Sequence, residues 1–313
     1  MGQILSYIGG NGPRALFLGV FLGLALPDLA GLLRPILPLA VATLLLFALL
    51  RVDWSIMAGY LRQPLRCGLL VSWMLLVSPA IAWLAVALLP LPDALKTSIV
   101  LMACAPPILG ATAIAMLLGL DGALVVVIGI VCTLLAPMTV PPLALALLGL
   151  DLQVGVAELM LRLAALVLGA FLAALLLRRL VGLAKIRSYH RQLDGLMVLT
   201  MLIFAISVME GVTAAALDRP GMVTLWLAAA FVANPILQLL GWLAFSWMGR
   251  RRALSAALMS GNCNMGLLLA ALPQNTDFAV VLFFAIAQLP MYMLPALIAP
   301  IYRRLLPSPE TPS

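Results

Sequence analysis

The chain has 313 residues, of which 65% are hydrophobic and 9% are charged, and its net charge is +7. A soluble domain typically carries about 25% charged residues, because its surface must face water. This composition therefore excludes a soluble protein of the same length. The basic residues are dispersed among short connections instead of forming one patch, which argues against a nucleic-acid partner.

The apolar runs are long enough to cross a lipid bilayer as helices. Most of them extend over roughly 20 residues, the length that a transmembrane helix needs, whereas barrel strands would read as alternating segments of about ten. We therefore expect an all-α membrane protein with a single transmembrane domain over residues 1–313. In chain order the ten expected spans are 14–32, 35–51, 66–90, 94–119, 122–149, 154–177, 195–216, 222–248, 252–272 and 278–302.

The distribution of Lys and Arg predicts the orientation in the membrane. Fourteen of the 18 basic residues fall at the two ends of the chain and in the connections after the second, sixth and eighth spans. Since cytoplasmic connections carry the excess of Lys and Arg, both termini are expected on the cytoplasmic side. The longest connection, 178–194, is strongly basic and belongs to this side. The expected location is the cell inner (plasma) membrane, crossed many times.

Helix-breaking residues interrupt four of the spans. The third span carries Pro79 and the eighth carries Asn234-Pro235, each near its middle. The fourth span is broken at Pro106-Pro107 and the ninth at Gly261-Asn262. Proline removes an amide donor, and glycine allows close backbone approach.

These breakers predict an internal repeat. A separation of 156 residues relates Pro79 to Pro235 and also Pro106 to Asn262. Ten spans divide into five and five, and an odd number requires the second half to enter the membrane inverted. Such inverted repeats are typical of secondary transporters. We expect a first repeat over residues 1–150 and a second over 151–313.

Broken helices at membrane depth predict a binding site. Backbone groups without helical partners persist in a membrane where they line a cavity or bind something. The fourth and ninth spans should therefore cross near the middle of the membrane and bind the substrate. The candidate substrate-binding residues are Pro106, Pro107, Thr112, Asn234, Asn262, Asn264 and Gln288.

Two stretches of the chain resemble a known transporter family. GLDGALVVV at 119–127 and TLLAPMTVPPL at 133–143, within 102–145, look like the fourth and fifth helices of the bile acid:sodium symporter family. GNCNMGLLLAAL at 261–272 resembles the start of that family's ninth helix. Ten helices, cytoplasmic termini and the five-plus-five repeat match its bacterial members. Arsenite and auxin efflux carriers belong to the same wider superfamily.

The resemblance implies a panel made of spans 1, 2, 6 and 7 and a core made of the other six. A small organic, anionic substrate would bind between panel and core and be moved by alternating access, with Na⁺ as a coupling ion and no other cofactor. The protein would function within the lipid bilayer, and the resemblance is compatible with a monomer. The candidate sodium ligands are Thr112, Ser260, Cys263 and Asn264.

Most polar sodium-site positions of the family hold other residues in this chain. The family's glutamate before the ninth-helix break corresponds to Met259, and its helix 3 glutamine corresponds to Met74. The polar positions of the fifth helix correspond to Val125 and Gly129. Asn264 keeps its residue type, so any sodium site should be neutral and weak.

Three other functions compete with coupled transport. An uncoupled facilitator fits the same fold. Efflux of arsenite would use a cysteine such as Cys104 near the fourth-span break, although the apolar surroundings disfavour a thiolate. An intramembrane enzyme is disfavoured because the sequence has no HExxH, no GxSxG and no carboxylate pair at mid-membrane. The four cysteines, with no CxxC spacing, are expected to be packing residues.

Several polar residues also have a local structural interpretation. Glu158 and Arg162, four residues apart, predict an ion pair on one helix face. Asp121 follows a glycine in a tight turn and is expected to cap a helix. Asn234 and Gln238 line the cavity or hydrogen-bond between helices. Glu210 is expected at the solvated end of a helix or, alternatively, in a substrate or proton role.

Overall fold

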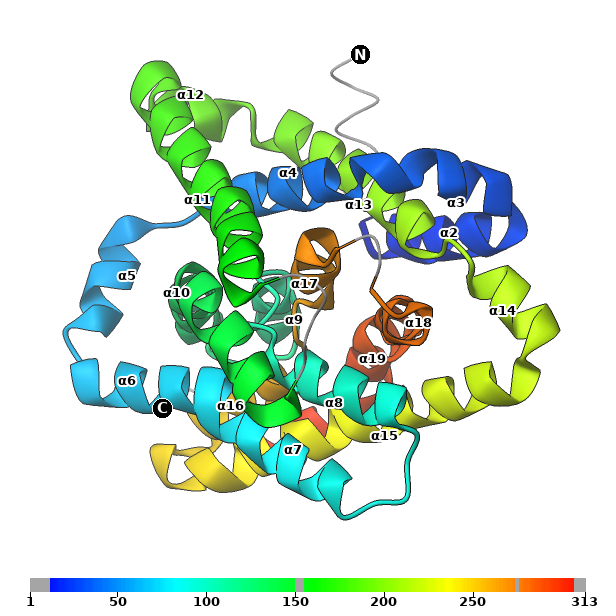
Figure 1. Ribbon diagram of the computed structural model, residues 1–313. Helices are drawn as coiled ribbons and strands as arrows, with labels where there is room; N and C mark the ends of the chain where they lie inside the picture. The colour runs from blue at the N-terminus through cyan, green and yellow to red at the C-terminus, as the bar shows by residue number, and fades with distance from the viewer. Residues whose placement is uncertain (1–11, 150–154, 274–275, 307–313) are drawn as a thin grey trace. The chain divides into compact units, whose positions relative to one another are not determined.

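The structure, a computed structural model, describes residues 12–149, 155–273 and 276–306. Across these residues the chain is helical, and no strand occurs among them (Figure 1). The helices of the first half are α2 (Gly12–Ala25), α3 (Pro27–Leu33), η1 (Arg34–Ile36), α4 (Leu37–Leu50), α5 (Trp54–Leu61), α6 (Pro64–Ser72), η2 (Trp73–Val77), α7 (Ser78–Ala87), α8 (Asp93–Cys104), α9 (Ala111–Leu117) and α10 (Gly122–Leu148). Those of the second half are α11 (Val156–Val181), α12 (Leu183–Ser188), α13 (His190–Val208), α14 (Val212–Asp218), α15 (Pro220–Phe245), η3 (Ser246–Met248), α16 (Arg250–Gly261), α17 (Met265–Ala271), α18 (Phe278–Ile286) and α19 (Gln288–Leu305).

Seven helical segments of the described residues are long and apolar enough to cross a membrane. They are Pro27–Leu50, Pro64–Ala87, Gly122–Leu148, Val156–Val181, His190–Asp218, Pro220–Met248 and Phe278–Leu305. Large apolar side chains on them are exposed, as at Leu161 (70%), Leu172 (63%) and Leu180 (71%) of α11. Such side chains are stable against lipid, so the architecture is that of an all-α membrane protein.

The predicted count of ten differs from these seven for a physical reason. The fourth and ninth expected spans are interrupted, and each half is shorter than a membrane crossing: 12 and 7 residues in both cases. The first expected span is also short, because α2 has 14 residues. Its predicted end at residue 32 was wrong.

Proline sets the first boundary earlier than predicted. The chain leaves the helical conformation at Leu26 (φ −125°, ψ 73°), because the residue before Pro27 is sterically pushed out of the α region. The expected gap at 33–34 is instead bridged by η1, a 3₁₀ turn that carries Pro35 at its start. The basic segment 178–194, predicted as a connection, is also mostly helical, since α12 and the start of α13 lie within it.

A π-helical turn precedes Pro79. Proline has no N–H, so a regular helix would leave a carbonyl unpaired one turn earlier. In η2 the helix widens, and the amide of Ser78 donates to the carbonyl oxygen of Trp73, five residues back. π-Turns are a recognised way of accommodating such a break. Predicted spans three, five and eight contain their prolines without ending, at Pro79, Pro137 and Pro235.

The described chain forms two compact units. Of the described residues, unit 1 comprises 12–52, 155–226, 266–273 and 276–286, and unit 2 comprises 53–149, 227–265 and 287–306. Unit 1 thus holds the four spans that the sequence resemblance assigns to the panel, with parts of the last three spans. The division into repeats 1–150 and 151–313 stays a prediction.

In unit 1, α13 packs against α2, α3 and α4, and α11 packs against α4. Two glycines one turn apart let α2 approach α13 closely. A Cβ on Gly19 would lie 2.8 Å from the Cβ of Ala205, and one on Gly23 would lie 2.8 Å from the carbonyl oxygen of Ile206. Small residues at this spacing are a common device for packing membrane helices.

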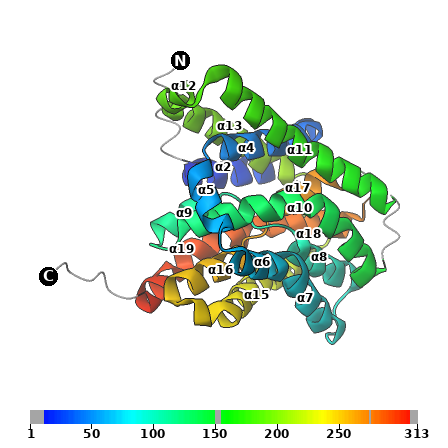
Figure 2. The ribbon, with the colours of Figure 1, turned by 90° about the vertical axis from the view of Figure 1, so that its left-hand side faces the viewer.

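In unit 2, α10 lies at the centre of the contacts, with α5, α6, η2, α8, α9 and α16 packed on it (Figures 1 and 2). Its 27 residues begin after Asp121, whose carboxylate accepts the amide of Leu124 at 3.0 Å, so the predicted cap is confirmed. The apolar core of this unit includes Leu70, Trp73 and Ile128.

Candidate functional site: the paired helix breaks

Two helices of unit 2 stop at the positions that the sequence predicts. Helix α8 ends at Cys104, and the next residue, Ala105, is extended (ψ 138°), as expected before Pro106. Helix α16 ends at Gly261, and Asn262 leaves the helical conformation (φ −99°, ψ 72°). Both interruptions predicted for the fourth and ninth spans are therefore present.

The two interruptions pair with each other through the main chain. Pro107 and Cys263 form an antiparallel bridge. The amide of Ile108 donates to the carbonyl oxygen of Asn262 at 2.8 Å, and the amide of Asn264 donates to that of Pro106 at 2.7 Å. Two chain segments without helical hydrogen bonds thus satisfy part of each other's backbone, as a low-dielectric interior requires.

The pairing leaves carbonyl groups at the end of α8 without a donor from their own helix. In a continuous helix the carbonyls of Ala103 and Cys104 would accept from residues 107 and 108. Pro107 has no N–H, and the amide of Ile108 is directed to Asn262. The last turn of α8 therefore presents acceptors, and the negative end of its dipole, toward the crossing.

A chain of buried amides extends from the crossing into α15 and α19. The Nδ2 of Asn234 donates to the carbonyl oxygen of Gly261 at 2.6 Å, and the Nε2 of Gln238 donates to the Oδ1 of Asn234 at 2.6 Å. The hydroxyl of Tyr302 then donates to the Oε1 of Gln238 at 2.7 Å. All three side chains are buried. Asn234 and Gln238 thus hydrogen-bond between helices, one of their two predicted roles.

Close approach at Gly261 makes this amide chain possible. A Cβ at Gly261 would lie 2.7 Å from the carbonyl oxygen of Asn234 and would also meet the side chain of Gln238. Glycine is needed here for space between α16 and α15.

Two buried oxygen atoms at the crossing have no hydrogen-bond partner among the described residues. Asn262 is fully buried, and its Nδ2 donates to the carbonyl oxygen of Leu258 at 2.8 Å, whereas its Oδ1 is unpaired. The Oγ1 of Thr112, in the first turn of α9, is also buried and unpaired. Buried polar atoms usually have a hydrogen-bond partner, so a ligand that donates hydrogen bonds to these two acceptors would gain the most binding free energy.

Two of the predicted sodium ligands already have protein partners. The hydroxyl of Ser260 accepts the indole N–H of Trp73 at 2.9 Å and donates to the carbonyl oxygen of Ala256 at 2.9 Å. The thiol of Cys263 donates to the carbonyl oxygen of Ser260 at 3.3 Å. Asn264 is half-buried, and its backbone amide donates to the carbonyl oxygen of Pro106 across the crossing.

The positions at which the resemblance expects polar sodium ligands lie in an apolar cluster. Met74, Val125 and Met259 are each at most 3% exposed and belong to one hydrophobic core. A Cβ on Gly129 would lie 2.9 Å from a methyl group of Leu109, so this position is also closely packed. Apolar side chains here provide no cation ligands.

One predicted residue remains, and two residues of the site were not predicted. Gln288 is buried at the first position of α19. Tyr302 and Trp73 were missed by sequence reasoning. The available signal was chemical, because a buried Tyr hydroxyl or Trp N–H usually finds a hydrogen-bond partner.

Other predicted local features are confirmed. Glu158 and Arg162 form an ion pair of 2.6 Å, and Glu210 lies 3.5 Å from Arg34 at a partly exposed site. The four cysteines are free and buried.

Comparison of the chain with models of known protein families and with curated proteins finds no match. The sequence resemblance therefore stays a prediction.

Proposed function

We propose that the protein is a secondary transporter that moves a small organic anion across the membrane by alternating access. In this proposal the chain crosses the inner membrane ten times, in two inverted five-helix repeats, with both termini in the cytoplasm. The three crossings beyond the seven long helices are α2 and the two interrupted pairs, α8–α9 and α16–α17.

One observation carries the proposal: two interrupted helices meet at one point inside an apolar protein. The crossing combines carbonyls at the end of α8 that have no donor from their own helix with the unpaired Oδ1 of Asn262 and Oγ1 of Thr112. These acceptors would receive hydrogen bonds from hydroxyl or amide groups of the substrate and would not contact its negative charge. Interrupted helices that place unpaired backbone and amide groups at mid-membrane are typical of transporter binding sites. The anionic nature of the substrate rests on the sequence resemblance to bile acid:sodium symporters.

A second candidate function, uncoupled facilitation, is favoured by the apolar cluster. Met74, Val125 and Met259 fill positions where sodium coupling would need oxygen ligands, and the hydroxyl of Ser260 is already engaged. Na⁺ prefers oxygen donors, and burying it among methionines would cost several kcal/mol. We therefore expect weak sodium dependence or none. Arsenite efflux through Cys104 is the remaining alternative within the same fold.

A thermal-shift screen of the purified protein tests the function without a known substrate. Taurocholate and a panel of smaller carboxylates would be compared in NaCl and in choline chloride, with arsenite as a separate arm. Ligand present at about 100 times its Kd stabilises by about 2.7 kcal/mol, which is a readily measured shift. A hit of equal size in both salts supports facilitation, and a hit that needs sodium supports coupling. Stabilisation by arsenite alone would contradict an organic substrate.

Replacing Asn264 with leucine tests the site. Its backbone bond to Pro106 does not involve the side chain, so the fold should persist while the stabilisation by the hit, and its uptake into proteoliposomes, is abolished. The matched control is Gln288→Leu, which makes the same chemical change at the start of α19 and should cost less uptake. Normal uptake by Asn264→Leu, with a melting temperature close to wild type, would mean that the site lies elsewhere.

Reporter fusions test the topology. Fusions at positions on the basic side should report cytoplasm, because Lys and Arg there outnumber those of the opposite side by 14 to 4. The cytoplasmic set is Arg66, Lys185 and Arg252, and the periplasmic set is Asp93 and Asp277. An inverted result at any two positions contradicts the ten-span arrangement.

A further inference from the structure

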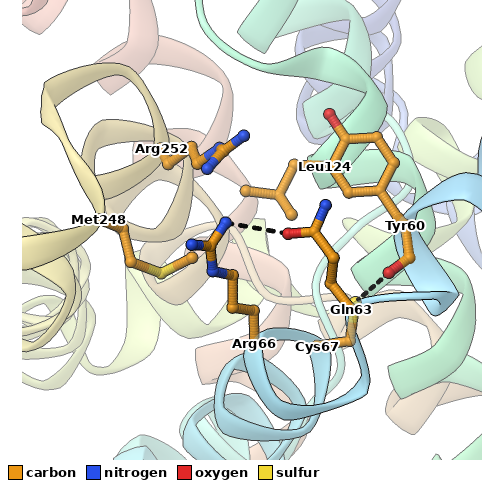
Figure 3. A pocket seen from close by; sticks show the side chains of 7 residues that line it. All are labelled: Tyr60, Gln63, Arg66, Cys67, Leu124, Met248 and Arg252. Atoms are coloured by element: carbon orange, nitrogen blue, oxygen red, sulfur yellow. Dashed lines mark hydrogen bonds between the residues drawn. The ribbon is translucent and has the colours of Figure 1, made fainter.

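A small basic pocket in unit 2 is separate from the paired breaks. Its wall includes Arg66 and Gln63 near the start of α6, Tyr60 of α5, and Arg252 of α16 (Figure 3). In Figure 3 the guanidinium group of Arg252 lies above that of Arg66, and the thioether of Met248 lies beside Arg66. The enclosed space holds about one water molecule, so an organic solute does not fit inside it.

The pocket carries more positive than negative charge. Arg66 donates to the neutral amide of Gln63 at 2.9 Å, and no ion pair involves Arg66 or Arg252 within the described part of the chain. The carboxylate beside the pocket is Asp121, which forms an ion pair with neither arginine but is hydrogen-bonded to Tyr60 of the pocket wall and to its own helix. It accepts the hydroxyl of Tyr60 at 2.8 Å and the amide that it caps in α10.

Both arginines occupy helix positions that disfavour a cation. Arg66 is the third residue of α6, and Arg252 is the third residue of α16. The first turn of a helix carries partial positive charge, so cations there are destabilising unless an anion is close. Arg250 and Arg251 add to the charge in the same turn of α16, and the side chain of Arg251 donates to the carbonyl oxygen of Leu120.

We propose that this pocket binds the phosphate group of an anionic phospholipid headgroup. Two guanidinium groups without carboxylate partners match the charge of a phosphate, and each can donate paired hydrogen bonds to its oxygens. The phosphate would rest at the mouth, because the space behind it is too small. Exposed apolar side chains on the same elements favour a lipid over free phosphate. Leu65 (75% exposed) and Leu69 lie on α6, and Trp247 (61% exposed) directly precedes Met248.

These apolar residues would contact the acyl chains, and tryptophan is enriched where membranes meet water. Basic pockets between membrane helices bind anionic headgroups in this way. The inference is independent of the transported substrate, since none of its residues belongs to the paired breaks.

Native mass spectrometry of the protein in detergent micelles doped with lipid tests the proposal. Phosphatidylglycerol should bind about 30-fold more tightly than zwitterionic phosphatidylcholine, because two arginines near a headgroup contribute about 1 kcal/mol each. The double variant Arg66→Gln/Arg252→Gln should lose this preference. The matched control is Arg179→Gln/Arg191→Gln, which removes the same charge from exposed arginines of unit 1 and should keep it.

Two further arms use the wild-type protein alone. Raising the salt concentration about tenfold should weaken phosphatidylglycerol binding and leave phosphatidylcholine binding unchanged. Inorganic phosphate should compete poorly, because it lacks the acyl chains. Equal binding of the two lipids, a preference that survives in the double variant, or equal loss in the control overturns the proposal. Binding of inorganic phosphate as tightly as phosphatidylglycerol overturns the lipid as occupant.

Discussion

Replacing Asn234 with alanine should destabilise the protein by breaking the amide chain at its middle. The Nδ2 of Asn234 holds the carbonyl oxygen of Gly261, and its Oδ1 accepts from Gln238. Alanine removes both bonds and leaves the two partners unpaired in a buried site, since Asn234 is 1% exposed.

The magnitude follows from the number of bonds. Hydrogen bonds between membrane helices contribute about 0.6 kcal/mol on average and up to about 1.7 kcal/mol. Two such bonds predict a loss of about 1–3 kcal/mol in the free energy of unfolding. Tyr302→Phe removes one bond at the end of the same chain, so its loss should be about half as large.

Reversible unfolding by SDS in mixed micelles measures both losses. Because Asn234 and Tyr302 are linked through Gln238, the double variant should lose less than the two single losses added together. Gln238 bonds to both residues, so its bond to one of them contributes less once its bond to the other has been removed. A loss below about 0.5 kcal/mol for Asn234→Ala, smaller than one average bond, would refute the reasoning.

Three other outcomes follow from particular contacts. Gly261→Ala should cost more than about 1 kcal/mol of stability, because the new methyl group meets the backbone of α15. Gly169→Ala, with open space around it, should be neutral or stabilising. Titration with SDS compares the two variants. Burial and the hydrogen bond to Asp121 raise the pKa of Tyr60 to about 12, so the folded state holds this proton more tightly than the unfolded state. The stability that Tyr60 contributes should therefore be complete below about pH 10 and lost between about pH 10 and 12; melting curves of wild type and Tyr60→Phe should converge over that range, and a constant difference would contradict it. Glu210→Gln should change the free energy of unfolding by less than about 1 kcal/mol, because its pairing with Arg34 is partly exposed, and a larger loss would indicate a buried role.

Local chemistry made part of the site predictable. Pro106 and Pro107 cannot continue a helix, and their effect acts within one turn, so the α8 break was readable from the sequence. The cap at Asp121 and the ion pair of Glu158 with Arg162 depend on residues three or four positions apart, and both are present.

The unpredicted contacts join residues far apart in the chain. Ser260 appeared available as a cation ligand until the structure placed Trp73, 187 positions away, against its hydroxyl. The same holds for Tyr302, which reaches Gln238 from 64 positions away. Sequence periodicity indicates which face of a helix is apolar, but it does not indicate which helix packs on that face.

Boundary errors had a different cause. The first span was misplaced because Pro27 and Pro35 look equivalent in the sequence, yet one ends a helix and the other begins a 3₁₀ turn inside one. The residue before Pro27, Leu26, leaves the α region, whereas Arg34 before Pro35 stays in it (φ −54°, ψ −44°).

The bonds that join the two breaks run from main chain to main chain, between Ile108 and Asn262 and between Asn264 and Pro106. Every amino acid except proline brings the same amide donor, and every one brings the same carbonyl. Side chains around the crossing can therefore be exchanged over generations without undoing the joint itself. Substitutions in the surrounding side chains change the lining of the crossing, whereas the two main-chain bonds that hold this lining in place remain.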